Sequence, residues 1–173
     1  MENISYQRAT LKDNIAIAAL IKLARKEDGN LYPEGVDEDI IYWVIETITD
    51  GYVIKATAGN KIIGTISFTI RPWPWNRKRK WLHNEWLFVH RAYRNMGVSD
   101  KLIGMAKMLA EDYGLDLAIG MMSGVKPEVK DRYVATKGLR YAGGFLLKLH
   151  ESKENVESVR SENEGGIEQS SLG

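Results

Sequence analysis

The middle of the sequence contains a strand, a long helix and a second strand, and this succession limits the possible folds more than any other feature. Residues 81–90 predict the first strand. Residues 97–113 predict the helix, because apolar side chains recur there at helical spacing on one face. The nearly continuous apolar run at 115–121 predicts a strand covered on both faces. A strand–helix–strand unit within a longer chain indicates an α/β domain with a mixed sheet.

Shorter elements flank this unit. We expect strands at 4–9, 52–56 and 62–70, a hairpin turn at 58–61, a loop at 71–80 and a closing hairpin at 139–150. We expect one helix to follow a capping box of Thr10 and Asp13 and to end near Gly29, and a second to be capped by Asp37. A further helix is expected at 127–136.

The length of 173 residues suits one domain, placed at 1–150, followed by a tail at 151–173. The tail holds six glutamates against Lys153 and Arg160, a net charge of −4, and it has no aromatic residue. Such a segment cannot bury enough apolar surface to offset the entropy lost on ordering. We therefore predict that the tail is disordered.

Composition excludes several classes of protein. The chain has no cysteine, which rules out disulfides, a cysteine nucleophile and thiolate metal sites. It has only three histidines, so we expect no metal centre. No apolar run reaches the roughly 18 residues of a membrane span, and the first residues lack the pattern of a signal peptide. We expect a cytoplasmic protein with no membrane partner.

The segment from Glu85 to Ser99 carries the clearest chemical signal. A strand runs into a short loop, and the loop opens the long amphipathic helix. The first turn of a helix offers backbone N–H groups without intrahelical acceptors at a positive dipole end, which suits an anion such as pyrophosphate. Gly97 allows close approach of the backbone, and Arg94 adds a cation. The alternative is an ordinary strand-to-helix turn that contains a glycine.

Arg94-x-x-Gly97-x-Ser99, preceded by Leu87-x-Val89 and Tyr93, resembles the acyl-CoA motif of the GNAT superfamily of N-acetyltransferases. The resemblance covers most of residues 4–149 and includes a closing element at 137–145. It implies a GNAT-like mixed, mostly antiparallel sheet of about seven strands flanked by about four helices. The serine at position 99, where the family prefers Gly or Ala, is a mild departure.

The resemblance also implies acetyl-CoA as the cofactor. Its pantetheine arm would pair with the backbone of Phe88 and Val89 in the manner of an added strand. The pyrophosphate would meet the turn and first helical residues, namely Arg94, Asn95, Met96, Gly97, Val98, Ser99 and Asp100.

Transfer of an acetyl group to an amine needs a group that takes the amine proton. Glu85 lies four residues before Val89, which on a strand places it on the same face as Leu87 and Val89, and many family members carry an acid here. Glu85 could equally be a surface carboxylate or an ion-pair partner of Arg91 or Lys80. His83, on the same face, competes as the base. The family's usual acid is a tyrosine four residues before the closing glycine; Val134 stands there, and Tyr133 is one residue early. Tyr133 therefore stays a candidate acid that could instead point into the core.

The segment 71–80 contains five basic residues and no acidic one, and four of the five tryptophans lie at 73–86. We favour a solvated tip whose tryptophans pack on the sheet. Acceptor binding through Trp73, Trp75 and, from another loop, Tyr32 comes second, and nucleic-acid binding is the least favoured reading.

Two functions from different classes follow. The first is an N-acetyltransferase that moves the acetyl group of acetyl-CoA to a primary amine, by direct attack in a ternary complex. The acceptor would be a small-molecule or protein amine. The protein could act as a monomer or as a homodimer. The second is a GNAT-like binding module that uses segment 71–81 on a nucleic acid or a partner protein, with weak or no catalysis. Turnover with an amine separates the two.

Overall fold

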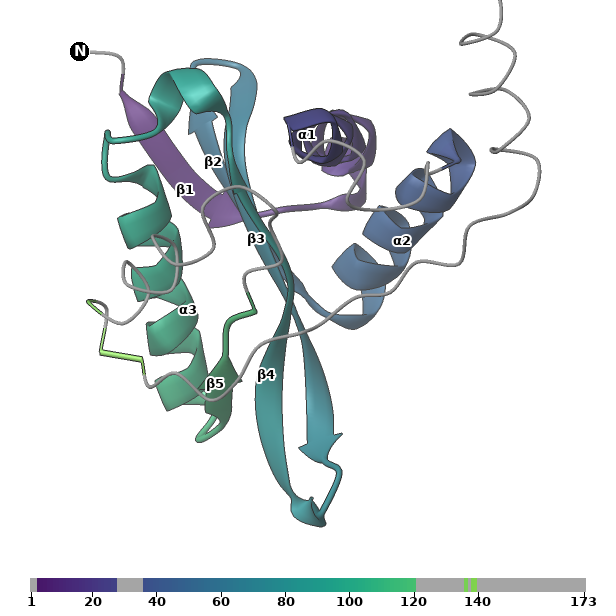
Figure 1. Ribbon diagram of the computed structural model, residues 1–173, viewed down its shortest axis with the longest axis vertical. Helices are drawn as coiled ribbons and strands as arrows, with labels where there is room; N and C mark the ends of the chain where they lie inside the picture. The colour runs from purple at the N-terminus through teal and green to yellow at the C-terminus, as the bar shows by residue number, and fades with distance from the viewer. Residues whose placement is uncertain (1–2, 28–35, 121–135, 137, 140–173) are drawn as a thin grey trace, which may run out of the picture. The chain divides into compact units, whose positions relative to one another are not determined.

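The computed structural model describes residues 3–27 and 36–120, together with Thr136, Gly138 and Leu139. They lie within one compact unit, Met1–Gly143 (Figure 1). The helix expected at 127–136, the hairpin at 139–150 and the domain boundary at 150 lie outside the described residues or almost entirely so. None of the described helices is long and apolar enough to cross a membrane.

The described residues form a five-stranded sheet in the order β1-β2-β3-β4-β5. Neighbours among the first four strands are antiparallel, whereas β5 runs parallel to β4. The expected α/β class with a mixed, mostly antiparallel sheet is therefore confirmed. The strands are β1 (Ile4–Arg8), β2 (Tyr52–Ala58), β3 (Lys61–Trp73), β4 (Asn76–Val89) and β5 (Asp116–Ala118).

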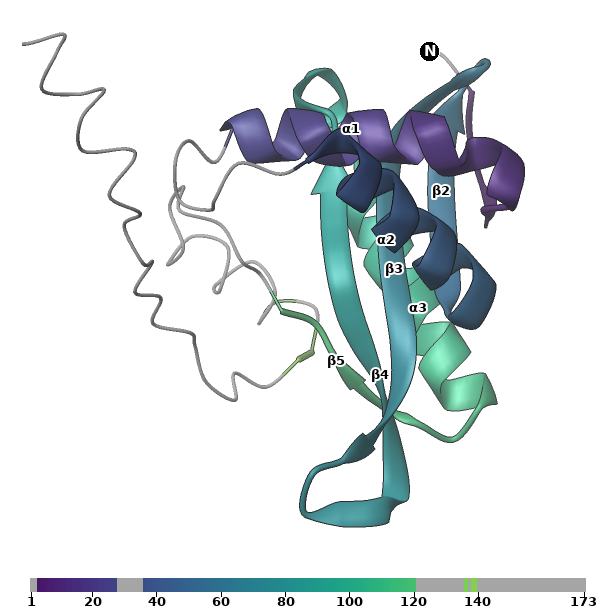
Figure 2. The ribbon, with the colours of Figure 1, turned by 90° about the vertical axis from the view of Figure 1, so that its right-hand side faces the viewer.

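Helices cover both faces of the sheet (Figures 1 and 2). On one face, α1 (Asn14–Glu27) and α2 (Asp37–Asp50) bury Ile17, Val44 and neighbouring apolar side chains together with Trp86 of β4. On the other face, α3 (Val98–Asp112) buries Leu102 and Ile103 against the sheet. Each helix has one apolar stripe, and burial of that stripe against a sheet face is what orders the helix.

The starts of the first two helices differ in how well the sequence predicts them. The Asp13 carboxylate accepts a hydrogen bond from Thr10 N at 2.8 Å, as expected of a capping pair. A short 3-10 turn, Leu11–Asp13, separates this cap from α1. The expected cap at Asp37 is wrong, because Val36 is the N-cap and Asp37 is the first helical residue. Its charge still favours the helix through the positive end of the dipole, and it pairs with Lys22 of α1.

The loop expected at 71–80 is also wrong, because β3 and β4 continue through it as a hairpin. Only residues 74 and 75 lie between the two strands. Trp73 and Trp81 stack across the strands with ring centroids 4.3 Å apart, and cross-strand aromatic pairs stabilise such a ladder. The last residue of β3 to pair with β2 is Phe68, so this hairpin extends past the sheet (Figures 1 and 2). We call residues 71–81 the arm.

The strand after α3 is shorter than expected. It comprises only Asp116–Ala118, and its residues are half-buried rather than covered on both faces. It pairs with β4 only at Trp81, Leu82 and His83. Residues of β4 beyond His83 therefore have no strand on this side within the described part of the chain.

Candidate functional site

The turn from β4 to α3 adopts two left-handed backbone conformations. After Val89 the chain makes a 3-10 turn, Arg91–Tyr93, and then passes through Asn95 with φ 68° and Gly97 with φ 75°. The α3 backbone begins its hydrogen bonding with Lys101 N to Gly97 O at 3.0 Å. Backbone N–H groups ahead of that bond have no acceptor inside the helix. The first backbone N–H groups of α3 thus lie in the turn that follows the end of β4.

Gly97 is required for its backbone and not for packing. A Cβ atom placed there would meet no atom within 4 Å. The left-handed φ favours glycine, and the open space above it leaves the helix end accessible. Val98, by contrast, is 1% exposed and packs closely against Gly64 of β3. A Cβ atom added to Gly64 would lie only 3.1 Å from Val98 Cγ1. That contact anchors the helix end to the sheet, and only the backbone of Val98 can serve a ligand.

Arg94 is held beside this turn by several contacts. Its Nε donates to the Val89 carbonyl at 2.9 Å, and its guanidinium lies 5.4 Å from the Phe88 ring centroid. It also forms an ion pair with Glu27 at the end of α1. The second carboxylate oxygen of Glu27 is buried without a hydrogen-bond partner in the described structure. Arg94 is therefore a fixed cation at the turn, but one that already has an acidic neighbour.

Phe88 and Val89 pair with Thr65 and Gly64 of β3 on one side. On the other side, the pairing of β4 with β5 has already ended at His83. The backbone near the end of β4 is therefore a free strand edge within the described residues. An extended ligand with amide groups can add to such an edge by main-chain hydrogen bonds.

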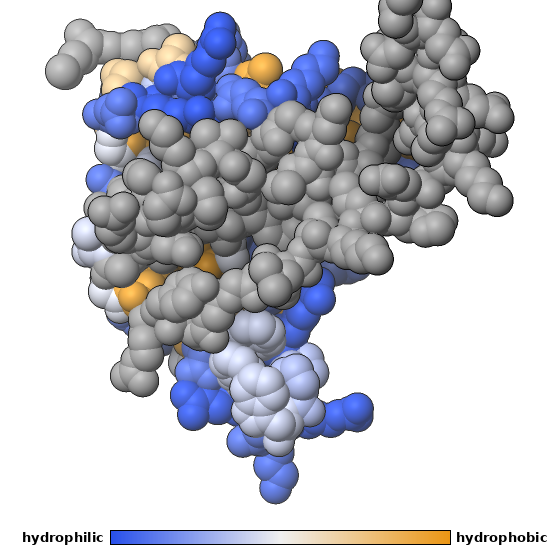
Figure 3. Space-filling model, in the orientation of Figure 1, coloured by the Kyte–Doolittle hydropathy of each residue, from blue (hydrophilic) through white to orange (hydrophobic). Residues whose placement is uncertain are grey.

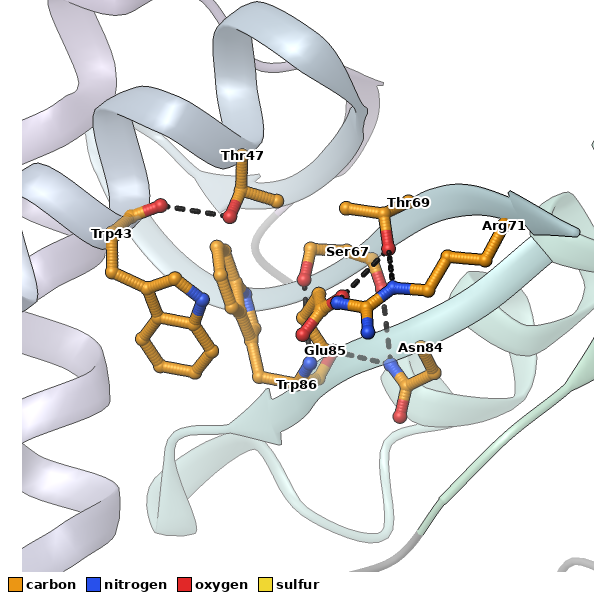
Figure 4. Close-up of polar contacts among 8 residues, drawn as sticks. All are labelled: Trp43, Thr47, Ser67, Thr69, Arg71, Asn84, Glu85 and Trp86. Atoms are coloured by element: carbon orange, nitrogen blue, oxygen red, sulfur yellow. Dashed lines mark hydrogen bonds and ion pairs between the residues drawn. The ribbon is translucent and has the colours of Figure 1, made fainter. Parts of the chain in front are cut away.

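A β-bulge lies in the middle of β4. Ser67 pairs with Trp86 and Phe68 pairs with Asn84. Glu85 is therefore an extra residue of β4 that has no partner residue on β3. The Asn84 side chain is 6% exposed and donates from Nδ2 to the carbonyls of Ser67, at 3.1 Å, and Trp86, at 2.7 Å (Figure 4). Asn84 thus bridges the two strands at the bulge.

The bulge changes which face each side chain takes. Leu87 and Val89 pack on the α3 side, while Trp86 packs on the α1–α2 side, where it meets Trp43 at 4.8 Å. Glu85 contacts Thr69, which follows Phe68 of the α3-side core and so lies on the opposite face. The expectation that Glu85 and His83 share a face with Leu87 and Val89 is therefore wrong, because the extra residue interrupts the alternation and His83 pairs with Thr69.

The Glu85 carboxylate lies in a polar cluster on the α1–α2 side. Its Oε1 accepts hydrogen bonds from Thr69 Oγ1 and from Arg71 Nη2, both at 2.6 Å (Figure 4). The side chain of Glu85 is 13% exposed and that of Arg71 is 52% exposed. Glu85 is thus a half-buried anion paired with an accessible cation of segment 71–80. The alternative of an ion pair with this segment is therefore what the structure shows, although the partner is Arg71 and not Arg91 or Lys80.

His83 lies next to this cluster, opposite Thr69 in the strand pairing. Burial lowers the pKa of His83; the nearby Glu85 charge raises it, and Arg71 lowers it further, with a net downward shift from 6.5. Its Nδ1 is buried without a hydrogen-bond partner in the described part of the chain. At neutral pH the ring is therefore uncharged and able to accept a proton.

The candidate acceptor residues fall into two groups. Trp73 is held by contacts within the protein, because its Nε1 donates a hydrogen bond to Asp116 at 2.7 Å and its ring stacks on Trp81. Trp75 is 79% exposed. Arg79 also binds Asp116, and the hydrogen bonds from Arg79 and Trp73 lower the pKa of that carboxyl. Tyr32 and the candidate acid Tyr133 lie outside the described residues.

Sequence reasoning missed Thr69, Arg71, Asn84 and Glu27 as neighbours of the site. The first three take their places from the β3–β4 register and its bulge, for which a single sequence carries no clear signal. Glu27 reaches Arg94 over a long sequence separation. The polar Asn84-Glu85 pair within the strand expected at 81–90 was the one available hint. Within the described residues, no group of three or more His, Cys, Asp or Glu side chains could hold a metal ion.

The arrangement defines a class of protein. It is an α/β domain in which a strand, a glycine turn and a helix N-terminus follow one another beside an unpaired strand edge of the described residues. Residues 17–130 match the model of the acetyltransferase (GNAT) family. The chain belongs to this family, and the resemblance noted in the sequence is confirmed. Comparison with curated proteins gives no match.

Solved structures show the same fold. A ribosomal-protein-alanine N-acetyltransferase from Brucella melitensis biovar Abortus 2308 has a TM-score of 0.67 at 14% identity, covering 86% of this chain and 99% of that one. A predicted acetyltransferase from Clostridium acetobutylicum, solved with acetyl-CoA, has a TM-score of 0.64 at 15% identity and covers 85% and 96%. AAC(6′)-Iy, in complex with the bisubstrate analogue CoA-S-monomethyl-acetylneamine, has a TM-score of 0.68 at 14% identity and covers 87% and 99%. At these identities the likeness concerns the fold alone.

Proposed function

We propose that this protein is an N-acetyltransferase that moves the acetyl group of acetyl-CoA to a primary amine by direct attack in a ternary complex. Membership of the family supports the reaction class. The observation that carries the proposal is the turn at Asn95–Gly97, where two left-handed residues leave the start of α3 open. A module that bound only a macromolecule would have no need of such an anion cradle.

The residues present fit coenzyme A at two places. Backbone N–H groups of Met96 to Asp100 would receive the pyrophosphate, with Arg94 as the neighbouring cation. The free edge at Phe88 and Val89 would pair with the amides of the pantetheine arm. Acetyl-CoA, when bound, supplies the thioester carbonyl that the amine attacks.

The acceptor amine must lose a proton to become a nucleophile. We assign this role first to Glu85, directly or through a water, because the bulge turns its carboxylate to the α1–α2 side and Thr69 and Arg71 hold it there. Both of these hydrogen bonds use Oε1, so the proton would be taken at Oε2. His83 is the competing base, uncharged at neutral pH and adjacent on the same face. Tyr133 stays the candidate acid for the leaving thiolate.

The test is incubation of the purified protein with acetyl-CoA and a panel of amines, read as release of free thiol and as the mass of the acetylated product. The panel holds polyamines, aminoglycosides, amino acids and peptides with a free N-terminus or lysine. We expect one class to raise thiol release well above the rate of hydrolysis without an amine. Binding of coenzyme A without acetyl transfer to any amine class would instead favour the binding module.

A further inference from the structure

Apart from Arg71, which holds the Glu85 carboxylate, the arm has no role in the proposed reaction. It extends past β2, and of its residues only Trp81 pairs with β5 (Figures 1 and 2). Residues 74–80 are all exposed. At the lower end of Figure 3, where the arm lies, the surface is blue to pale and shows no hydrophobic patch. This face of the arm is therefore mainly polar.

The arm carries an uncompensated positive charge. Of its five cations, Arg71 pairs with Glu85 and Arg79 pairs with Asp116. Arg77, Lys78 and Lys80 have no acidic partner among residues 3–27 and 36–120. Three neighbouring cations without counter-charges attract a polyanion, which releases its condensed counterions on binding.

A shallow pocket lies beside these cations. It has a volume of about 370 Å³ and lies between the arm and the turn that follows α3. Its lining consists of Asn76, Lys78, Arg79, Lys80, Gly114 and Leu115. Ammonium, guanidinium and amide donors around one concave surface match the oxygens of a phosphate group.

Trp75 adds an aromatic surface at the end of the arm. Its side chain is 79% exposed, and its ring centroid lies 4.9 Å from that of Trp73. Trp73 is itself fixed by its stack on Trp81 and its hydrogen bond to Asp116. A tryptophan supported on one side and open to solvent on the other is a platform on which a nucleobase can stack.

We infer that the arm binds single-stranded nucleic acid, with Arg77, Lys78 and Lys80 on the phosphates and Trp75 on a base. An acidic polypeptide would satisfy the cations but would give the exposed indole no planar partner. A duplex would offer phosphates but keep its bases stacked inside. This inference does not depend on acetyl transfer, and its test can fail while coenzyme A still binds.

The test is fluorescence anisotropy of an end-labelled oligothymidylate of about 15 nucleotides, within the site sizes of single-strand binders, titrated with the full-length protein. We expect saturable binding that weakens as salt is raised. Stacking on tryptophan should also quench the intrinsic fluorescence. An unlabelled duplex of the same length and polyglutamate should compete poorly.

Two variants separate the contributions. Trp75→Ala should weaken binding about tenfold, the effect expected when one stacked base is lost. Lys78→Glu combined with Lys80→Glu should abolish binding at moderate salt. The matched controls are Tyr42→Ala, an aromatic side chain that is 72% exposed on α2, and Lys12→Glu combined with Lys61→Glu, which changes the net charge equally. Both controls should bind as the unmodified protein does.

Absence of binding at low salt would overturn the inference. So would unchanged affinity of Trp75→Ala, or an effect of the Lys12 and Lys61 changes as large as that of Lys78 and Lys80. Equal competition by polyglutamate would reassign the arm to acidic polypeptides. Loss of affinity in both arm variants, with both controls intact, supports the inference.

Discussion

Gly97 combines a left-handed backbone with open space above it, and these two properties can be tested separately. Gly97→Glu places a bulky anion where the pyrophosphate is proposed to bind, so coenzyme A affinity should fall by at least tenfold. Isothermal titration with coenzyme A measures the effect.

Gly114→Glu is the matched control. Gly114 has φ 61°, and a Cβ there would also meet no atom within 4 Å, but it lies at the other end of α3. Both changes should cost a similar backbone strain of about 1–2 kcal/mol. If the two variants lost affinity equally, or if folded Gly97→Glu lost none, the pyrophosphate would have to bind elsewhere.

Glu85 and His83 make different predictions as the base. Glu85→Gln keeps the size of the side chain but removes its proton-accepting carboxylate, so turnover near neutral pH should fall by about 10²–10⁴-fold. Coenzyme A affinity should hold, and a higher pH should restore part of the rate because more of the amine is already neutral. Steady-state kinetics with the acceptor found in the amine panel measure this.

Near-normal turnover of Glu85→Gln would show that Glu85 is not the base and would favour His83 in that role. In that case the rate should be at its full value above pH 6.5 and fall as pH drops through the lowered pKa of His83, where the ring becomes charged. His83→Gln should then remove both the activity and this acid limb.

At the level of the element, the bulge in β4 places Glu85. Asn84→Ala removes the donor that bridges the carbonyls of Ser67 and Trp86. Leaving buried acceptors without a donor costs about 1–3 kcal/mol, so the midpoint of thermal unfolding should fall. The carboxylate of Glu85 should also lose its orientation, so kcat should fall while coenzyme A affinity, which depends on the far end of the strand, stays the same.

Ser67→Ala is the milder comparison, because the Ser67 hydroxyl accepts only one bond at the bulge, from Trp86 N at 3.3 Å. A normal kcat for a destabilised Asn84→Ala variant would show that the bulge serves the fold and not the site.

At the level of the whole molecule, the candidate site depends on where the pairing between β4 and β5 ends. β4 and β5 pair over three residues, and past His83 the edge of β4 has no strand neighbour within the described residues. The glycine turn lies at the end of that same edge, so the two places proposed for coenzyme A follow one another along the chain. Glu85 belongs to this edge, and its carboxylate binds Arg71 of the arm.

The acidic segment 151–173 is expected to contribute nothing to folding. Its six glutamates and lack of aromatic residues leave little to bury. Truncation after His150 should leave the midpoint of thermal unfolding within about a degree of that of the full chain, as measured by circular dichroism. A fall of many degrees would show that the segment packs on the domain.

Local patterns determined most of the elements. The apolar stripes of α1, α2 and α3 are visible in the residue spacing, and the turns at Gly59 and Gly97 are marked by glycine, so the sequence predicted them. The arm was mistaken for a loop because its two prolines and its charges are typical of turns. Its strands persist because Trp73 meets Trp81 across the hairpin and Asp116 from beyond α3, contacts that no local pattern contains.

The sequence by itself determined the fold class, the family and the position of the glycine turn, because strand, glycine and helix are adjacent along the chain. Only the tertiary structure decided which way Glu85 faces, because one bulged residue moves its side chain and Trp86 onto the same side of the sheet. It also decided which charges are paired. Arg71, Arg79 and Arg94 all look alike in the sequence, yet each meets an acid 14 or more residues away, whereas their neighbours on the arm meet none among the described residues. Register and long-range pairing arise when distant segments pack, so the chemistry of the site follows from the folded chain.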